Sequence, residues 1–549
     1  MSLIPSRETV NIEFKSDKRG LPDSSLIESI VGLANTNGGE LFLGVEDDGT
    51  ISGVSPNHED ITGLVALVAN RTIPSLRVDA EIIKEKNKKI IRIIIPKSKS
   101  IISTSDGKML RRRLKLDGTP ENAPMYPFEI NSRLAELNLL DFSAQILSGA
   151  SINDFDNNER ARLRNIIKLR KGDNSLLDLS DEELDKALRF VKEENGILYP
   201  TITGMLLIGK ESKIKELMPT AESSFQVLEG TQIRVNEHFF KPLLATFEIF
   251  ENYMKVWNPE REMESGLFRI PIPEFSDKAF REGLVNAFCH RDYTMLGTTR
   301  VSINDEGLTI SNPGGFVEGV NLNNLLTVEP HGRNPALADS LKRIGLAERT
   351  GRGIDRIFEG SIVYGRPLPD YSESTDKEVK LFIPRAEPDI SFAKMISDEE
   401  QKIGRSLPIN SLLILSTLQR QRRLPLHELA MSIGISEART RAAVEALVES
   451  GLVEAIESGR NRSYILSEKV YKRQNNIEGY VRQTASDYSR IEEMICSLAK
   501  QRGNITRSDV MKLLRIDSSK AYYLLKKIVK NGRLISEGIG RSAKYKFRK

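Results

Sequence analysis

Acidic side chains near the start of the chain have the spacing of a divalent-metal site. Glu8 and Glu13 stand five residues apart in ETVNIEFK, and the run LFLGVEDDG adds Glu46, Asp47 and Asp48. If the two strands that carry these groups are neighbours, three or more carboxylates converge and repel one another unless a cation lies among them. Mg²⁺ or Mn²⁺ in such a site supports phosphodiester hydrolysis. Solvated acids at strand ends would give the same pattern.

Basic residues accompany these acids. Lys15 follows Glu13 by two residues on the same strand face, where it could contact a phosphate group. The cluster RRRLK, residues 111–115, fits a phosphate-contacting edge. An edge strand that is charged to prevent aggregation would look the same.

A second group of polar residues lies in FREGLVNAFCHRDY. Glu282 and Asn286 are four residues apart, so a helix places both on one face. One could orient water while the other holds Mg²⁺ on a nucleotide. His290, Arg291 and Asp292 are secondary candidates, because a helix that ends in HRDY is as readily a cap and an ion pair.

Glycine-rich turns follow this helix. Asn312 begins the turn NPGG, and Gly351 and Gly353 open a helix whose N-terminal amides could accept phosphate.

Upstream, GMLLIGKE at 204–211 has the spacing of a P-loop, but Glu211 replaces the required Ser or Thr and the interior is apolar. We therefore expect a buried strand at 204–211 and no P-loop helicase.

The predicted secondary structure that must position these groups differs from one segment of the chain to the next. The first 128 residues are short β-branched runs around a helix at 25–35 that ends before Asn-Gly-Gly, an α+β pattern. Residues 129–199 are charged and helical, with a capping box at Ser180 and Glu183. Mixed α/β patterning covers 200–388, and few apolar periods occur in 389–408, where we expect a linker.

The last two segments, 409–468 and 485–549, repeat one order of three helices and a hairpin, which is that of a winged helix. The third helix of such a domain enters the major groove and the wing touches the backbone. Winged helices also serve as protein-binding modules, and the acidic residues on the third helix of the first copy are consistent with that use. The expected DNA contacts are Arg439, Arg441, Arg460 and Arg462 in the first copy and Ser519, Lys520, Tyr522, Tyr523, Lys526, Arg541 and Lys544 in the second.

Composition supports several domains and a nucleic-acid partner. A chain of 549 residues exceeds the roughly 100 to 200 residues of one domain. The segment 485–549 holds sixteen Lys and Arg against six Asp and Glu, a net +10 that can offset phosphate charge. No apolar run reaches the roughly 20 residues of a membrane span, no secretory signal is visible, and only two cysteines occur. We expect a cytoplasmic homo-oligomer without a membrane partner.

The motifs at the N-terminus resemble a known family. ETVNIEFK and ANTNGGELFLGVEDDGTISGV are similar to the Schlafen-type AlbA-like domain over roughly residues 6–125. The resemblance implies contact with DNA or RNA. It also implies a metal-binding nuclease site at Glu8, Glu13 and Asp47.

The central segment resembles the divergent GHKL-type ATP-binding module that often follows an AlbA-like domain and is labelled RecG-related or helicase-like. Asn312 departs from that family, which has an aspartate accepting from the adenine amino group, so ATP binding is better supported than hydrolysis. A degenerate scaffold without nucleotide remains the alternative. The resemblance implies Glu282 as general base, Asn286 as magnesium ligand, Asn312 with Gly314 as adenine-side box, and Gly351 with Gly353 as phosphate lid.

We therefore expect an α/β and α+β multidomain chain: an AlbA-like domain (1–128), a helical connector (129–199), a GHKL-like ATP-binding α/β sandwich (200–388), a linker (389–408) and two winged helices (409–468 and 485–549). Three functions follow. The first is an ATP-binding, DNA-binding regulator of the transcription-regulator type. The second is a divalent-metal-dependent nuclease of defence or stress response. The third is an adaptor whose sites are inactive.

Overall fold

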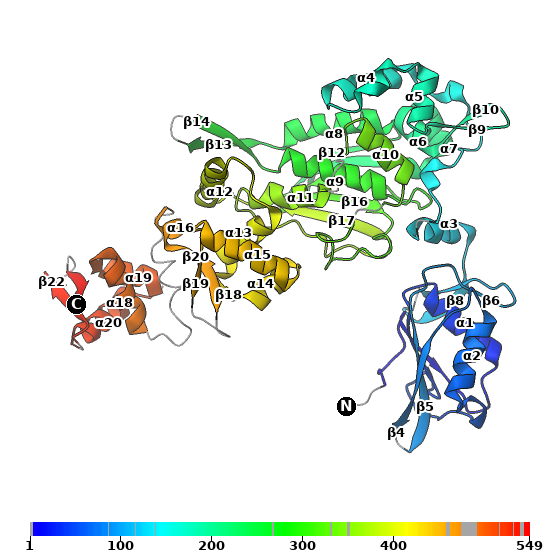
Figure 1. Cartoon of the computed structure of the whole chain (residues 1–549), viewed down its shortest axis with the longest axis horizontal. Helices are drawn as coiled ribbons and strands as arrows, with labels where there is room; N and C mark the ends of the chain where they lie inside the picture. The colour runs from blue at the N-terminus through cyan, green and yellow to red at the C-terminus, as the bar shows by residue number, and fades with distance from the viewer. Residues whose placement is uncertain are drawn as a thin grey trace.

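The structure is a computed structural model of the chain. It describes residues 4–85, 87–115, 117–137, 139–265, 268–329, 332–347, 352–456, 462–473, 491–514, 516–530, 532–538 and 543–548. Figure 1 shows an N-terminal domain in blue, a central α/β body in cyan and green, and two smaller units in yellow to red. Among these described residues, no helix combines the length and apolar composition that a bilayer crossing requires.

The N-terminal domain is built on a four-stranded sheet with the order β1-β2-β5-β4. β1 and β2 are parallel and are joined by helix α1, because parallel neighbours need a crossover. The predicted turn before β2 is confirmed: a Cβ on Gly39 would lie 2.1 Å from the Asn11 carbonyl oxygen, so only glycine fits. The elements are β1 (Ile12–Lys15), α1 (Asp23–Ala34), β2 (Gly39–Leu43), α2 (Ile61–Arg71), β3 (Thr72–Ile73), β4 (Asp79–Glu85), β5 (Lys88–Ile95), β6 (Ser103–Thr104), β7 (Leu110–Leu114) and β8 (Pro120–Pro124).

Helix α3 (Pro127–Glu136) connects this domain to the central body. Arg133 is buried there and donates to the Ser98 carbonyl at 2.6 Å and to the Glu318 carboxylate at 3.0 Å. Lys97 lies 3.0 Å from the same carboxylate. One acid of the central body is therefore paired with two cations from the N-terminal side.

The expected helical connector is α4 (Asn157–Leu169) and α5 (Asp181–Ala187), with short helical turns between. The predicted capping box is confirmed, since the Ser180 hydroxyl accepts from the Glu183 amide at 3.3 Å and Glu183 accepts from the Ser180 amide at 2.9 Å. Leu163 and Ile167 of α4 are buried in the core of the central body. The segment is thus a layer of that body.

A five-stranded sheet with the order β12-β11-β15-β16-β17 forms the central body. Helices α8 and α9 pack along it (Figure 1), and Phe280 and Leu284 of α9 share a core with Val301 and Ile310 of the sheet. The result is an α/β sandwich. Its elements are β9 (Val191–Glu194), β10 (Ile197–Pro200), α6 (Ile202–Ile208), α7 (Glu211–Leu217), β11 (Ser223–Glu229), β12 (Gln232–Phe239), α8 (Leu243–Trp257), β13 (Glu260–Ser265), β14 (Phe268–Pro273), α9 (Asp277–His290), β15 (Thr299–Ile303), β16 (Gly307–Pro313), α10 (Pro335–Arg343), α11 (Gly353–Ile362) and β17 (Glu378–Pro384).

The structure differs from the sequence expectation at two segments. The apolar run at 204–208 belongs to helix α6, not to a strand. Every residue of α6 is buried, and a buried helix and a buried strand both have a continuous apolar sequence, so the sequence does not distinguish them. The expected linker contains helix α12 (Ile390–Ile403). Phe392, Met395 and Ile396 of α12 have the spacing of one helical face and are buried in the core of the first winged helix.

Both winged helices are confirmed. The first has the sheet order β18-β20-β19 and the second β21-β23-β22, each beside three helices and with its own core. The first comprises α13 (Ile409–Gln421), β18 (Arg423–Pro425), α14 (Leu426–Ile433), α15 (Glu437–Glu449), β19 (Val453–Ile456) and β20 (Ser463–Leu466), followed by α16 (Glu468–Arg473). The second comprises α18 (Ile491–Arg502), β21 (Ile505–Thr506), α19 (Arg507–Leu514), α20 (Ser518–Lys530), β22 (Leu534–Glu537) and β23 (Lys544–Phe547).

Candidate functional sites

The two predicted acids of the N-terminal domain lie beside a buried arginine. Glu13 on β1 is 3% exposed and forms an ion pair with Arg112 of β7, which is 2% exposed. Glu8 accepts a hydrogen bond from the Phe14 amide at 2.7 Å. Burial lowers the pKa of Arg112, and the charge of Glu8 opposes that shift. A guanidinium therefore supplies the positive charge that the acids were expected to take from a metal ion.

Neighbouring side chains complete this network. Lys15 lies 2.6 Å from Glu13 Oε1, and the Ser29 hydroxyl donates to the same oxygen at 3.3 Å. Arg112 also donates to the backbone carbonyls of Thr9 and Ile12, at 3.0 and 3.2 Å. Lys15, expected to contact a phosphate, is thus paired with Glu13.

Asp47 is exposed beyond the end of β2, whereas Glu13 is buried on β1. In the described ranges, no group of three or more His, Cys, Asp or Glu side chains is arranged to hold a metal ion. The three carboxylates do not fit a divalent ion as they stand here. In the adjacent basic cluster, Arg111 and Arg113 both pair with Glu129, at 3.1 and 3.2 Å.

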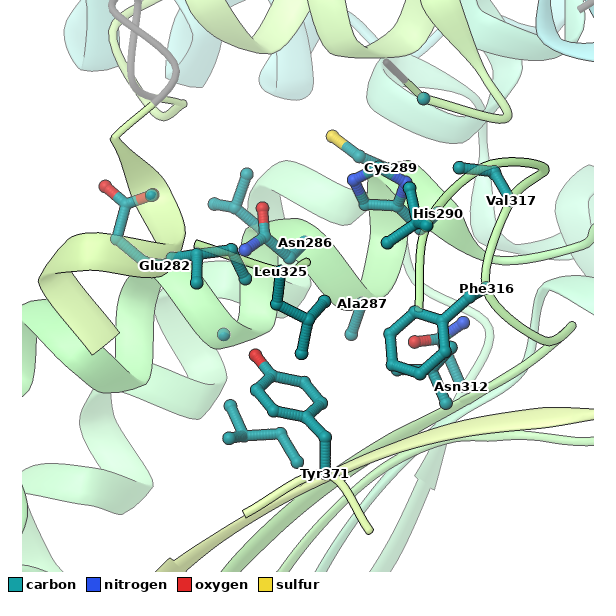
Figure 2. Close-up of a pocket in the computed structure, with 18 of the residues that line it drawn as sticks. Glu282, Asn286, Ala287, Cys289, His290, Asn312, Phe316, Val317, Leu325 and Tyr371 are labelled. Carbon is teal, nitrogen blue, oxygen red and sulfur yellow. The ribbon is translucent and has the colours of Figure 1, made fainter. Parts of the chain in front are cut away.

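The predicted residues of the central body come together. Glu282, Asn286, Asn312 and Gly353 all line one cavity of about 270 Å³ between α9, the start of α11 and the sheet. Figure 2 shows Glu282 and Asn286 on the same helix, with Asn312 and Phe316 at the other side of the cavity. The four-residue spacing therefore places Glu282 and Asn286 on the face of α9 that lines the cavity, as expected.

The end of the cavity at Glu282 is polar. Glu282 is 4% exposed, and its carboxylate pairs with Arg356 of α11 at 3.2 Å. A Cβ on Gly353 would lie 3.0 Å from Glu282 Oε2 and 3.7 Å from Asn286 Nδ2. The first turn of α11 is thus held directly against both side chains. Gly351 lies outside the described residues.

The opposite end is largely apolar, with Asn312 and His290 as polar side chains. Phe316 and Val317 line that end, and Leu325 and Tyr371 line the middle, where Figure 2 shows the Tyr371 hydroxyl directed into the cavity. Asn312 Nδ2 donates to the Pro313 carbonyl at 3.1 Å. Burial raises the pKa of Tyr371, and it raises that of the lining Cys289 thiol to about 12, so both groups stay protonated at neutral pH.

Two of the secondary candidates have structural roles. Arg291 is buried and donates to Thr299 Oγ1 at 3.1 Å and to the Gly297 carbonyl at 2.6 Å. Asp292 pairs with buried Arg333 at 2.8 Å. A Cβ on Gly314, which has φ +95°, would lie 2.8 Å from the Asp292 Cβ. This network holds the NPGG turn; of the HRD residues, His290 alone lines the cavity.

Helix α11 connects the cavity to the first winged helix. Its first residue borders the cavity, and Ile357 lies in the core of the central body. Ile362 at its other end is buried in the core of the winged helix, and Phe358 packs against both cores. Leu326, from the loop after β16, also lines the cavity and packs on the winged-helix core.

The arginines of the first winged helix are not equivalent. Arg439 and Arg441 are exposed on α15, as expected for DNA contacts. Arg462 on the wing side pairs with Glu445 at 2.9 Å and lies over the Tyr464 ring at 5.3 Å. Its charge is therefore partly neutralised. Arg460 lies outside the described residues.

In the second winged helix, Tyr522, Tyr523 and Lys526 are exposed on α20, and Lys544 is exposed on β23. Arg507 at the start of α19 was not expected, yet its guanidinium lies over the Tyr522 ring at 4.7 Å. Its position at the start of the helix that precedes the recognition helix has no local sequence signal. Ser519 and Lys520 belong to α20, and Arg541 lies outside the described residues.

Family models match four segments of the chain. Residues 8–117 match "Schlafen, AlbA_2", residues 132–224 a domain of unknown function (DUF8451), residues 297–383 "Putative ATP-dependent DNA helicase recG C-terminal", and residues 407–454 "Winged helix-turn-helix DNA-binding". No curated protein matches the chain.

Among solved structures, the DIP2311 protein from Corynebacterium diphtheriae matches with a TM-score of 0.52 and 21% identity over 85% of this chain and 94% of that chain, which shows the fold alone. A transcriptional regulator matches with a TM-score of 0.12 and 13% identity over 25% of this chain and 82% of its own, which carries no argument. The chain is therefore similar to the Schlafen AlbA_2 domain at its N-terminus, to the recG C-terminal model in the central body, and to the winged helix-turn-helix model in the first winged helix.

Proposed function

We propose that the chain is an ATP-binding, DNA-binding regulator in which occupancy of the central cavity changes the placement of the first winged helix. The observation behind this proposal is that helix α11 borders the cavity at Gly353 and contributes Ile362 to the core of the first winged helix. A rigid helix that contacts both sites passes a displacement at one end to the other. Leu326 provides a second connection between the same two regions.

The composition of the cavity supports ATP as its ligand. The apolar end can take a base, with the Asn312 side-chain oxygen as acceptor for the adenine amino group. The polar end has the N-terminus of α11, whose dipole favours phosphate, and Asn286 would hold Mg²⁺. The volume of about 270 Å³ is slightly below the roughly 300–1,000 Å³ of typical ligand pockets.

When bound, ATP supplies a phosphoryl group that water can attack. Glu282 would act as the general base toward that water, as the GHKL resemblance implies. Its carboxylate is paired with Arg356, which occupies one side of it. We therefore propose nucleotide binding as the primary role of the cavity, with hydrolysis weak.

The test is titration of the full chain with a fluorescent ATP analogue and Mg²⁺, followed by DNA binding with and without ATP. We expect Asn286→Ala to weaken nucleotide binding by at least about tenfold, and Asn252→Ala on the exposed face of α8 to leave it unchanged. Linkage requires that DNA change ATP affinity by the same factor as ATP changes DNA affinity. Nucleotide binding without any effect on DNA affinity would refute the regulatory proposal.

A divalent-metal-dependent nuclease is the second candidate, and the AlbA_2 match with its Glu8 and Glu13 favours it. Such activity, in defence or stress response, would require Arg112 to move away from Glu13 and Asp47 to approach. Incubation with labelled single- and double-stranded RNA and DNA, with Mn²⁺ or Mg²⁺, tests this directly. Cleavage that disappears in Glu13→Ala would establish the nuclease.

A further inference from the structure

The two winged helices present different chemistry on their third helices. The exposed cations of α15 are arginines, Arg439 and Arg441. Helix α20 instead exposes two neighbouring aromatic rings, with Tyr522 at 43% and Tyr523 at 66%. A tyrosine ring is a large apolar surface that folding normally buries. Two exposed rings at consecutive positions of the third helix indicate a contact with another flat apolar group.

Two cations lie against the Tyr522 ring. The Arg507 guanidinium lies 4.7 Å from the centroid of Tyr522, and the Lys526 ammonium lies 6.0 Å from it. Lys526 follows Tyr522 by one helical turn, so the two side chains share a face. Lys544 on β23 of the same domain is also exposed. The domain therefore has the two parts of a strand-binding site, aromatic rings for bases and cations for phosphates.

Duplex DNA does not offer base faces to such rings. In the major groove a helix meets only the edges of paired bases, which arginine and amide side chains read by hydrogen bonds. Base faces become available where bases are unpaired, and an exposed aromatic ring then gains a stacking contact. Tyrosine and lysine on α20 suit the second situation, whereas the arginines of α15 suit the first.

We infer that the second winged helix binds single-stranded DNA, with bases stacked on Tyr523 and Tyr522 and phosphates held by Arg507, Lys526 and Lys544. The net +10 of residues 485–549 supplies the charge that this partner requires. The inference rests on the proposed DNA-binding function and names the form of DNA that one of its two winged helices contacts.

Fluorescence anisotropy of the full chain tests this with a labelled single-stranded DNA of mixed sequence, its duplex and a single-stranded RNA of the same sequence. We expect Tyr523→Ala to weaken single-strand binding on the order of tenfold, with duplex affinity nearly unchanged. Tyr523→Phe keeps the ring and should stay within about twofold of the unaltered chain. Arg439→Ala should show the reverse pattern, with loss on the duplex.

Equal effects of Tyr523→Ala on single-stranded and duplex DNA would overturn the inference, as would no effect on either or a preference for RNA. If single-strand binding fails while ATP still changes duplex binding, the proposed regulatory function stands and this inference falls. Tyr523 is mostly exposed, so the variant should fold; an unchanged melting temperature of the full chain checks this.

Discussion

Replacing Glu13 with glutamine isolates the role of the buried pair with Arg112, because it removes the charge and keeps the shape. Both side chains are at least 97% buried, so solvent screens their interaction little. Removing one partner of a buried ion pair costs about 3–5 kcal/mol. Arg112 would keep its bonds to the Thr9 and Ile12 carbonyls and its attraction to Glu8, so we expect about 2–3 kcal/mol.

Hydrogen exchange read by mass spectrometry on the full chain measures this locally. Peptides from β1 and β7 should exchange roughly 30- to 160-fold faster in Glu13→Gln. Glu28→Gln is the control, since its partner Lys108 is half exposed and the pair should contribute nothing measurable. Slower exchange in Glu13→Gln, together with protection of the unaltered chain by Mn²⁺, would refute the reasoning. That result would mean that the acids repel one another in the unaltered chain and are held together by a metal ion.

Further predictions concern other parts of the chain. Gly314→Ala should destabilise the central body by about 1–3 kcal/mol in denaturant unfolding, because it adds a clash with Asp292 to a positive φ; Gly319→Ala, at φ +85° with open space around it, should cost less. Burial alone would raise the pKa of Glu318, but Lys97 and Arg133 outweigh it and lower that pKa. The stabilisation that Glu318 gives to the contact between the N-terminal domain and the central body is therefore present above its unfolded pKa and is lost as pH falls through its folded pKa. Small-angle scattering should then show any expansion on the acid side. Arg462→Ala should weaken duplex binding less than Arg441→Ala, because Glu445 already pairs with Arg462. The expected homo-oligomer is checked by light scattering of the purified chain.

The cavity shows how far spacing alone can predict a site. Glu282 and Asn286 were predictable because a separation of four residues fixes two side chains on one helix face. Tyr371 and Leu325 were not, since each lies in a segment with no local pattern and reaches the cavity only through the packing of loops around β16 and β17. Long-range placement of this kind leaves no periodic signal.

Arg112 illustrates a different limit. Side chains alternate between the two faces of a strand, so in RRR of β7 the middle residue points inward and its neighbours outward. Three identical residues hide that alternation, and the cluster looked like a uniformly charged edge. The winged helices were predictable by contrast, because the order of three helices and a hairpin occurs twice and each copy has its own apolar periods.

The core that α11 and α12 share with the first winged helix has a consequence for how the chain unfolds and how it can be divided. Ile362, Phe392 and Leu415 belong to one continuous apolar cluster, so the central body and the first winged helix should melt in one cooperative transition. The second winged helix has a separate cluster and should melt on its own. A fragment cut before α12 would expose the apolar end of α11 and tend to aggregate, whereas one that ends after Arg473 keeps that cluster whole.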